Sequence, residues 1–489
     1  MRALGPSASL ACLVACGASQ APQASGLSVS PGVALLPCAV SGVGRPALCG
    51  VVTVPEDRAT RAGRVLSLEL IVVPAADKER ARPDPLFVLA GGPGQAATDL
   101  AAQTLEAFAP IAETRDIVFV DQRGTGRHSP LRCSIIGDDG HIGALAGGVL
   151  PEDRLRDCLA HMDARPELYT TSVAVDDYDE IAARLGYDRV SLFGGSYGTE
   201  VAQEMMRRHP GRVRAVVLDA VSPVDVDFVV AFATNAQHVF DAVADECARD
   251  PACHGAFPDP RGDLERALAH YRASPARVSA PVQGQARATA TLDANAVAMM
   301  VRLLLYSADT RGWVPAIVHA AAAGDDAAIA PYVVRGAARA AEATSVGLYL
   351  SVTCAEDVAG LTELEAERAT AGTFLGTARV GPILRACAFW PRGSLPPDFH
   401  QPVRSDAPVL FLNGTLDPAT PAALVDHVRA SLPNARAVIV PGGGHGVSNE
   451  GCVPGIVARF LEDPAAPVDP SCVGAVATKF RLEVRAGVR

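Results

Sequence analysis

The stretch Gly194-Gly195-Ser196-Tyr197-Gly198 follows directly after the apolar run 190–193. A buried strand that turns abruptly into a helix needs small residues two before and two after the turn residue, because larger side chains would collide with the neighbouring strand and helix. Gly194 and Gly198 meet this need. The sequence therefore predicts a tight turn that exposes the Ser196 hydroxyl at the end of a sheet, beside the free N–H groups of a helix N-terminus.

Further apolar runs alternate with helical stretches on both sides of this turn. Two strand-like segments come first, and their alternating pattern is typical of an antiparallel start to a sheet. The continuously apolar runs that follow indicate strands buried on both faces. Strands that alternate with helices at this spacing predict an α/β fold with a mostly parallel, doubly wound sheet. The expected strands are 50–54, 65–73, 86–90, 116–120, 190–193, 213–218, 409–412 and 437–440.

One long segment interrupts this alternation. From about residue 222 to residue 404 the sequence is Ala-rich and helical, without convincing buried strands. It is too long to be a connection within a sheet. We therefore expect a core domain in two parts, 38–221 and 405–489, interrupted by a helical cap over 222–404.

The N-terminus resembles a bacterial lipoprotein signal. Residues 1–16 carry Arg2 and a short apolar stretch that ends in Leu13-Val14-Ala15-Cys16, which predicts lipidation of Cys16. An ordinary secretory signal is the alternative. Residues 17–37, rich in Ser, Ala, Pro and Gly, are expected to form a flexible tether. No later apolar run reaches the ~18 residues of a bilayer span, so the expected membrane attachment is by lipid, in the bacterial cell envelope, or the protein is secreted.

Composition limits the class of protein. The chain has 489 residues, of which 49% are hydrophobic and 20% charged, as in a globular protein. Its net charge of −11 and the absence of a basic block argue against a nucleic-acid partner. The sequence predicts no cofactor.

The cysteines favour an oxidising compartment. Of 12 cysteines, Cys12 falls within the signal and Cys16 at the lipid site, which leaves an even number. Pairing in sequence order is the simplest hypothesis. A metal site is not predicted, because no CxxC spacing occurs and no histidines cluster near the cysteines. The expected pairs are Cys38–Cys49, Cys133–Cys158, Cys247–Cys253, Cys354–Cys387 and Cys452–Cys472.

The exposed serine needs partners before it can act as a nucleophile. A serine hydroxyl requires a base to take its proton, and the base requires an acid to orient it. His445 follows a late strand within Gly442-Gly443-Gly444-His445-Gly446, so we predict it as the base. Asp417, after the preceding strand, is the predicted acid. Asp219, after the strand that follows Ser196, is its rival.

An oxyanion hole needs two backbone N–H groups. The residue after the nucleophile, Tyr197, should supply one. The other should come from Gly91-Gly92-Pro93-Gly94, where glycines let the backbone approach a substrate closely, and Gly92 is our choice.

Four motifs together resemble one family. They are Gly91-Gly92-Pro93-Gly94, Asp121-Gln122-Arg123-Gly124-Thr125-Gly126-Arg127, the Ser196 turn and Asp417-Pro418-Ala419-Thr420-Pro421. The chain resembles the secreted proline iminopeptidase and tripeptidyl aminopeptidase group of α/β-hydrolases over about residues 38–472. The resemblance implies an exopeptidase that removes one to three residues from a peptide's free N-terminus through an acyl-enzyme on Ser196.

The resemblance also implies acidic cap residues that bind the substrate's free amine, often within a Cys-x-Asp motif. This chain has Cys354-Ala355-Glu356-Asp357, so Glu356 stands at the Asp position and Asp357 is an additional candidate. Many iminopeptidases have His before the first Gly of the Gly91 loop, where this chain has Ala90. Two other functions stay open: a carboxylesterase or other acyl hydrolase with the same triad, and a non-catalytic envelope binding protein.

Overall fold

The computed structural model describes residues 32–133, 135, 148, 150–226, 228–282 and 285–484. The predicted signal, its Cys16 lipid site and most of the predicted tether lie outside these residues. Among the described residues no helix is both long and apolar enough to cross a membrane.

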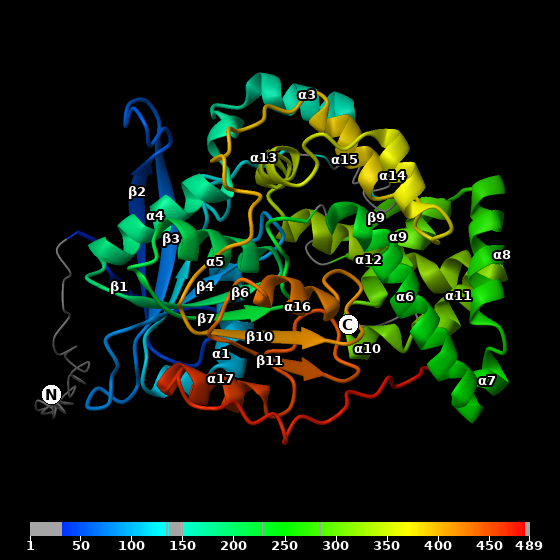
Figure 1. Cartoon of the computed structure of the whole chain (residues 1–489). Coiled ribbons are helices and arrows are strands. Elements are labelled where there is room, and N and C mark those ends of the chain that lie inside the picture. The colour runs from blue at the N-terminus through cyan, green and yellow to red at the C-terminus, as the bar shows by residue number, and fades with distance from the viewer. Residues whose placement is uncertain are drawn as a thin grey trace, which may run out of the picture.

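A nine-stranded sheet forms the centre of the molecule, in the order β1-β2-β3-β5-β4-β6-β7-β10-β11 (Figure 1). The first three strands pair antiparallel, and β3 also pairs antiparallel with β5. Every pairing from β5 to β11 is parallel. The predicted fold class, an α/β fold with a mostly parallel sheet, is confirmed. The strands are β1 (Leu36–Cys38), β2 (Ala47–Pro55), β3 (Val65–Val73), β4 (Leu86–Leu89), β5 (Ile117–Val120), β6 (Val190–Gly195), β7 (Val213–Asp219), β10 (Val409–Gly414) and β11 (Ala435–Val440).

The strand β1 corrects the prediction of a tether over 17–37. Leu36 pairs with Cys49 and Cys38 with Ala47, so the end of the expected tether is the edge strand of the sheet. Three residues are too few to show an alternating pattern, which explains why no strand was predicted there.

Helices cover both faces of the sheet, and an apolar core lies on each face. One core contains side chains of α4 (Thr171–Arg184), α5 (Tyr197–Arg208) and α16 (Ala423–Arg429). The other contains side chains of α1 (Ala101–Ala107) and α17 (Val453–Glu462). Because both faces are covered, the parallel strands β4, β5 and β10 are buried along their whole length.

The chain between β7 and β10 forms the cap, which lies to the right of the sheet and above it in Figure 1. Helix α3 (Glu152–His161), which precedes β6 in the chain, packs beside the cap helix α15. The cap helices are α6 (Phe228–Arg249), α7 (Pro251–Ala256), α8 (Pro260–Ala273), α9 (Ala294–Leu304), α10 (Ala308–Arg311), α11 (Val314–Ala322), α12 (Asp326–Ala343), α13 (Val346–Glu356), α14 (Glu363–Thr370) and α15 (Val380–Cys387).

The cap also contains strands, contrary to the expectation of a purely helical segment. β8 (Ala276–Val282) and β9 (Gln285–Leu292) form an antiparallel pair. The buried side of this hairpin is made largely of alanines, including Ala280, Ala288 and Ala290. Alanine has a low strand propensity, so the alternation was hidden within an Ala-rich sequence.

The tail of the chain, residues 474–484, packs on the cap, although the sequence assigned it to the core segment 405–489. The N–H of Arg481 donates to the carbonyl of Gly312 at 3.0 Å. Arg311 Nε donates to Thr478 Oγ1 at 2.7 Å, and that hydroxyl donates to Glu246. The tail therefore connects the end of the core to α6 and α10.

Five disulfides join the ten cysteines of the described residues in the predicted sequence order, so the pairing is confirmed. Cys354–Cys387 links α13 to α15 within the cap. Cys38–Cys49 links the edge strand β1 to β2.

Candidate active site

Ser196 lies between β6 and α5 in a strained backbone conformation, with φ 56° and ψ −126°. A Cβ atom at Gly194 would lie 2.2 Å from the Gly198 carbonyl oxygen. A Cβ atom at Gly198 would lie 2.2 Å from the carbonyl oxygen of Leu89 on the neighbouring strand. The two glycines are therefore required for the close approach of β6, α5 and β4 that holds the serine at the sheet end.

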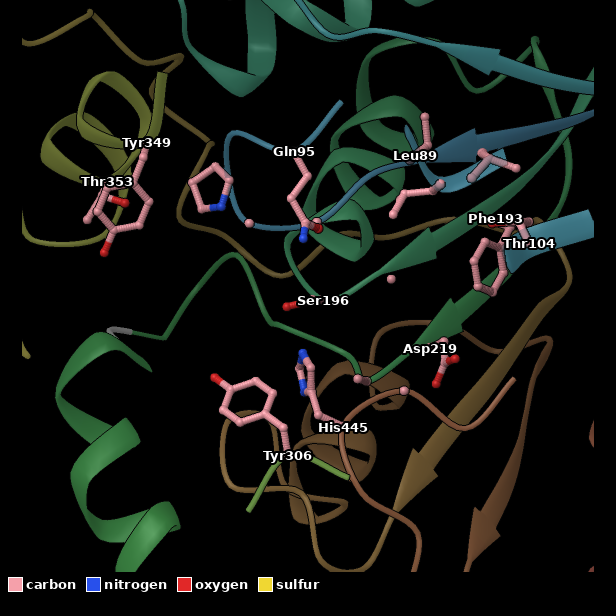
Figure 2. A pocket seen from close by; sticks show the side chains of 18 of the residues that line it. Leu89, Gln95, Thr104, Phe193, Ser196, Asp219, Tyr306, Tyr349, Thr353 and His445 are labelled. Atoms are coloured by element: carbon pink, nitrogen blue, oxygen red, sulfur yellow. The ribbon is translucent and has the colours of Figure 1, made fainter. Parts of the chain in front are cut away.

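Ser196 and His445 line the same cavity, which has a volume of about 440 Å³. Figure 2 shows the Ser196 hydroxyl and the His445 imidazole facing each other. His445 Nδ1 donates to the two carboxylate oxygens of Asp417 at 3.0 and 2.9 Å. Asp417 is 1% exposed, and it is held in turn by the N–H groups of Ala419 and Thr420. The structure thus brings together three residues that are up to 249 positions apart in the sequence.

Asp417 controls the charge of the imidazole. Burial by itself lowers the pKa of His445, but the negative charge and hydrogen bond of Asp417 outweigh it, and the net pKa is raised above the usual 6.5. The same contact leaves Nε2 as the ring nitrogen available to the serine, which is the arrangement that general-base catalysis requires.

Asp219, the rival acid, has a different set of contacts. Its carboxylate accepts hydrogen bonds from the N–H groups of Val447, at 2.9 and 3.0 Å, and Ser448, at 2.8 Å. Burial raises the pKa of Asp219. The carboxylate therefore anchors the loop just after His445, while Asp417 makes the hydrogen bond to the imidazole.

Of the two predicted oxyanion-hole residues, Gly92 lines the cavity and Tyr197 directly follows Ser196. Gly92, with φ +116°, lines it together with Gly91 and Pro93. Tyr197 is the first residue of α5, where an N–H has no intrahelical acceptor. Its side chain is buried, and its hydroxyl bonds to Gln122 and Thr171, which leaves the backbone N–H of Tyr197 as its group for the predicted role.

The Asp121-Gln122-Arg123 motif supports this wall from behind. Asp121 accepts hydrogen bonds from the N–H and hydroxyl of Thr98, just after the Gly91–Gly94 loop, at 3.0 and 3.1 Å. Arg123 is fully buried and forms a two-pronged ion pair with Asp177 on α4. The motif is therefore explained by packing, since it fixes the loop and the serine turn relative to each other.

The two acidic candidates of the cap separate in the structure. Asp357 lines the cavity with Tyr349 and Thr353, one helical turn apart on α13. Glu356 is 3% exposed, and its carboxylate oxygens accept from the N–H and the hydroxyl of Thr171, both at 2.6 Å. Glu356 therefore lies outside the cavity lining, because neighbouring residues on a helix point about 100° apart, and its contact with substrate stays a prediction.

Burial raises the pKa of Glu356 to about 8, against the opposing effect of the Thr171 hydrogen bonds. It is accordingly mostly neutral at pH 7. The buried Glu200 on α5 adds a third carboxyl, whose pKa is raised by burial and then by the charge of Asp357. Sequence reasoning missed Glu200, although its position one helical turn after Ser196 was a usable signal.

Three further residues at the cavity were not expected from the sequence. Tyr306 stacks edge-on against His445, with ring centroids 5.0 Å apart, and its carbonyl accepts the N–H of His445 at 2.8 Å. Figure 2 shows Tyr306 beside the imidazole. Phe232 and Arg379, from other parts of the cap, also line the cavity. No motif marks these residues, because the packing of the cap on the core brings them here.

Among the described residues no group of three or more His, Cys, Asp or Glu side chains could hold a metal ion.

Part of this site lies in a segment that is similar to a known protein family. Residues 374–472, which contain Asp417 and His445, match the family model described as TAP-like protein. The chain has the α/β-hydrolase fold. Serine protease Hip1 of Mycobacterium tuberculosis is 28% identical over 263 residues, covering 48% of this chain and 49% of the relative. The chain thus spans about half the length of the Hip1 serine proteases that it matches.

One further relative and one solved structure carry peptidase names. Tripeptidyl aminopeptidase of Streptomyces lividans is 28% identical over 194 residues, covering 36% of each chain. The crystal structure of proline iminopeptidase from Mycobacterium smegmatis superposes with a TM-score of 0.40 and 18% identity, covering 84% of this chain and 97% of that one. The resemblance seen in the sequence motifs is confirmed by the TAP-like family model and the tripeptidyl aminopeptidase match.

Proposed function

We propose that this α/β-hydrolase is a serine peptidase that removes one to three residues from the free N-terminus of peptides. The observation that carries the proposal is the His445–Asp417 pair, which faces Ser196 in a cavity that Asp357 also lines. A nucleophile, its base and a carboxylate for the substrate amine thus meet in one space. The peptidase names of the relatives support the same reaction class.

In the proposed mechanism Ser196 Oγ attacks the carbonyl carbon of the scissile bond while His445 Nε2 accepts the hydroxyl proton. Asp417 stabilises the imidazolium that forms. The N–H groups of Tyr197 and Gly92 would bind the oxyanion. The imidazolium then protonates the leaving amine, which departs and leaves an acyl-enzyme on Ser196. Water, deprotonated by His445, attacks the ester and releases the N-terminal fragment.

Asp357 is the proposed ligand of the substrate's ammonium group. It lines the cavity, whereas Glu356 is bonded to Thr171 behind the wall. Glu356 and Glu200 would act through Asp357, since the charge of Asp357 contributes to the raised pKa of both carboxyl groups.

The domain and localisation assignments are proposals that rest on the same features. We propose that the cap spans about 222–404 and closes over the two core parts, 38–221 and 405–489. The five disulfides are typical of an oxidising compartment. With the N-terminal sequence they favour a lipoprotein anchored at Cys16 in the cell envelope, or a secreted protein.

The deciding experiment uses arylamides of Pro, Ala and Ala-Ala-Pro, each with a free and an acetylated N-terminus. Cleavage of free-amine substrates alone is expected, and Ser196→Ala should lose at least about 1,000-fold in kcat/KM. The shortest substrate that is cleaved gives the product length. Cleavage of blocked substrates to the same extent, or of aryl esters alone, would assign the site to an endopeptidase or a carboxylesterase. Failure of a fluorophosphonate to label Ser196 would favour a binding protein.

A further inference from the structure

Two arginines of the cap lie together at the candidate active site. Arg379, just before α15, lines the cavity that contains Ser196 and His445. Arg302, on α9, is 3% exposed, and it donates to the hydroxyl of the cavity residue Tyr306. Both guanidinium groups pack over the ring of Phe232, with their central carbons 4.3 and 5.0 Å from its centroid.

These two cations are paired with rings rather than with carboxylates. Among the described residues, neither guanidinium group forms an ion pair with an Asp or Glu within 4 Å. By contrast, the buried arginines Arg115, Arg123 and Arg207 have acidic partners. The Nε atoms of Arg302 and Arg379 are buried and have no hydrogen-bond partner. A buried charge that lacks a counter-ion is costly, and it persists where it serves a ligand.

Arg302 keeps its charge in this setting. Burial lowers its pKa to about 10, Tyr306 opposes the shift, and the neighbouring Arg379 adds to it. The side chain is therefore cationic at neutral pH, and the positive potential of two guanidinium groups acts on one wall of the cavity. Aromatic contacts offset part of this cost, but the Nε–H donors of both guanidinium groups stay without an acceptor.

Guanidinium groups with free donors match planar carboxylates, which they bind through two parallel hydrogen bonds. We propose that Arg379, with Arg302 behind it, binds a carboxylate of the substrate in the candidate active site. The proposal rests on the proposed peptidase function and names its substrate class: peptides with a free amine at the Asp357 side of the cavity and a carboxylate at the Arg379 side. That carboxylate is either the C-terminus of a short peptide or an acidic side chain.

Paired peptides distinguish the two sources. Ala-Ala-Pro-Ala is compared as a free acid and as a C-terminal amide, which tests the C-terminal carboxylate. Ala-Ala-Pro-Asp amide is compared with Ala-Ala-Pro-Asn amide, which tests the side chain. Binding of all four is measured by titration calorimetry on Ser196→Ala protein, so that no turnover is needed.

In at least one pair we expect the carboxylate peptide to bind 10-fold or more tightly than its neutral partner. Adding Arg379→Gln should reduce that ratio to about 1, and Arg379→Lys should retain part of it because the charge remains without the planar fork. Arg385→Gln is the matched control, since Arg385 lies on the same helix but pairs with Glu152 outside the cavity. It should leave the ratio unchanged.

Three results would overturn the carboxylate site: equal binding within both pairs, a preference that survives Arg379→Gln, or no binding of any of the four peptides. Failure of the peptidase proposal would give a different result. In that case the carboxylate peptides would still bind selectively to Ser196→Ala protein, but the wild-type protein would not hydrolyse them.

Discussion

His445 lies between two buried carboxylates that have different tasks. Asp417 contacts the imidazole, and Asp219 holds the backbone of Val447 and Ser448 next to it. Both aspartates follow strands that end at the same edge of the sheet, so their positions in the sequence made them rivals. The hydrogen-bond geometry separates a partner of the ring from a support of its loop.

Asp417→Asn and Asp219→Asn should therefore differ in their pH profiles. Loss of the Asp417 charge removes what raises the pKa of His445, so the acidic limb of kcat/KM should move to lower pH and kcat should fall by about 10²–10⁴-fold. Asp219→Asn should lower stability by about 1–3 kcal/mol, because N–H donors lose a charged acceptor. Its acidic limb should move less. If Asp219→Asn gave the larger pH shift, the roles would be reversed.

Glu356 provides a second test at the level of single residues. Its native pKa of about 8 exceeds the value of 4.5 expected in the unfolded chain. Between these pH values the native state holds a proton that the unfolded state has released, so the stability that Glu356 contributes below pH 4.5 is lost as the pH rises toward 8.

Glu356→Gln imitates the neutral form and removes this pH dependence. The free energy of unfolding of the wild type, relative to the variant, should fall between pH 5 and pH 8 by more than about 1.4 kcal/mol, which is the equivalent of one pKa unit. Urea unfolding at both pH values measures it. Parallel stability profiles would contradict the assignment.

Asp357→Asn should instead raise KM for free-amine peptides and leave the cleavage of aryl esters unchanged.

At the level of elements, the β6–α5 turn depends on contacts between backbones. Gly198→Ala would place a methyl group 2.2 Å from the Leu89 carbonyl oxygen, which neither β4 nor α5 can avoid without moving. We expect a loss of stability of about 3 kcal/mol or more, at the upper end of overpacking effects. Gly195→Ala is the control, because its Cβ would meet no atom within 4 Å. Equal thermal stabilities of the two variants would contradict this account of the turn.

The helix α13 illustrates how one element divides its residues between two tasks. Tyr349, Thr353 and Asp357 repeat every four residues and face the cavity, while Glu356 faces Thr171 at the start of α4. Nearly every residue of α13 is buried and the helix has no amphipathic pattern, so its sequence did not indicate which side faces the cavity.

At the scale of the whole molecule, the disulfide Cys354–Cys387 joins the helix that carries the acidic cluster to the helix next to Arg379. It closes a loop with a sequence separation of 33, which predicts a contribution of about 3–4 kcal/mol in the chain-entropy model. Cys354→Ala with Cys387→Ala should lower the melting temperature and raise KM for free-amine peptides.

The matched control removes the disulfide Cys247–Cys253 at the junction of α6 and α7. This disulfide is equally buried, but it closes a loop with a sequence separation of only 6. It should cost about 2 kcal/mol and leave KM unchanged. A rise in KM of the same size in both double variants would show that the effect is general destabilisation rather than a displaced cavity wall.

Features that depend on neighbours along the chain could be predicted from the amino-acid sequence alone. Alternating apolar runs predicted the sheet, the glycines around Ser196 predicted the turn, and the order of the cysteines predicted all five disulfides. These patterns are local, since strand burial, a tight turn and a short covalent loop each leave a signal within a few tens of residues.

Only the tertiary structure decided which distant residues meet. It paired His445 with Asp417, directed Asp357 into the cavity, and brought Arg379 and Arg302 to the same wall. The physical reason is that these distances depend on how the cap packs on the core and on which side of each helix faces inward. Neither is encoded in the spacing of any single motif, because each results from side-chain packing summed over the whole molecule.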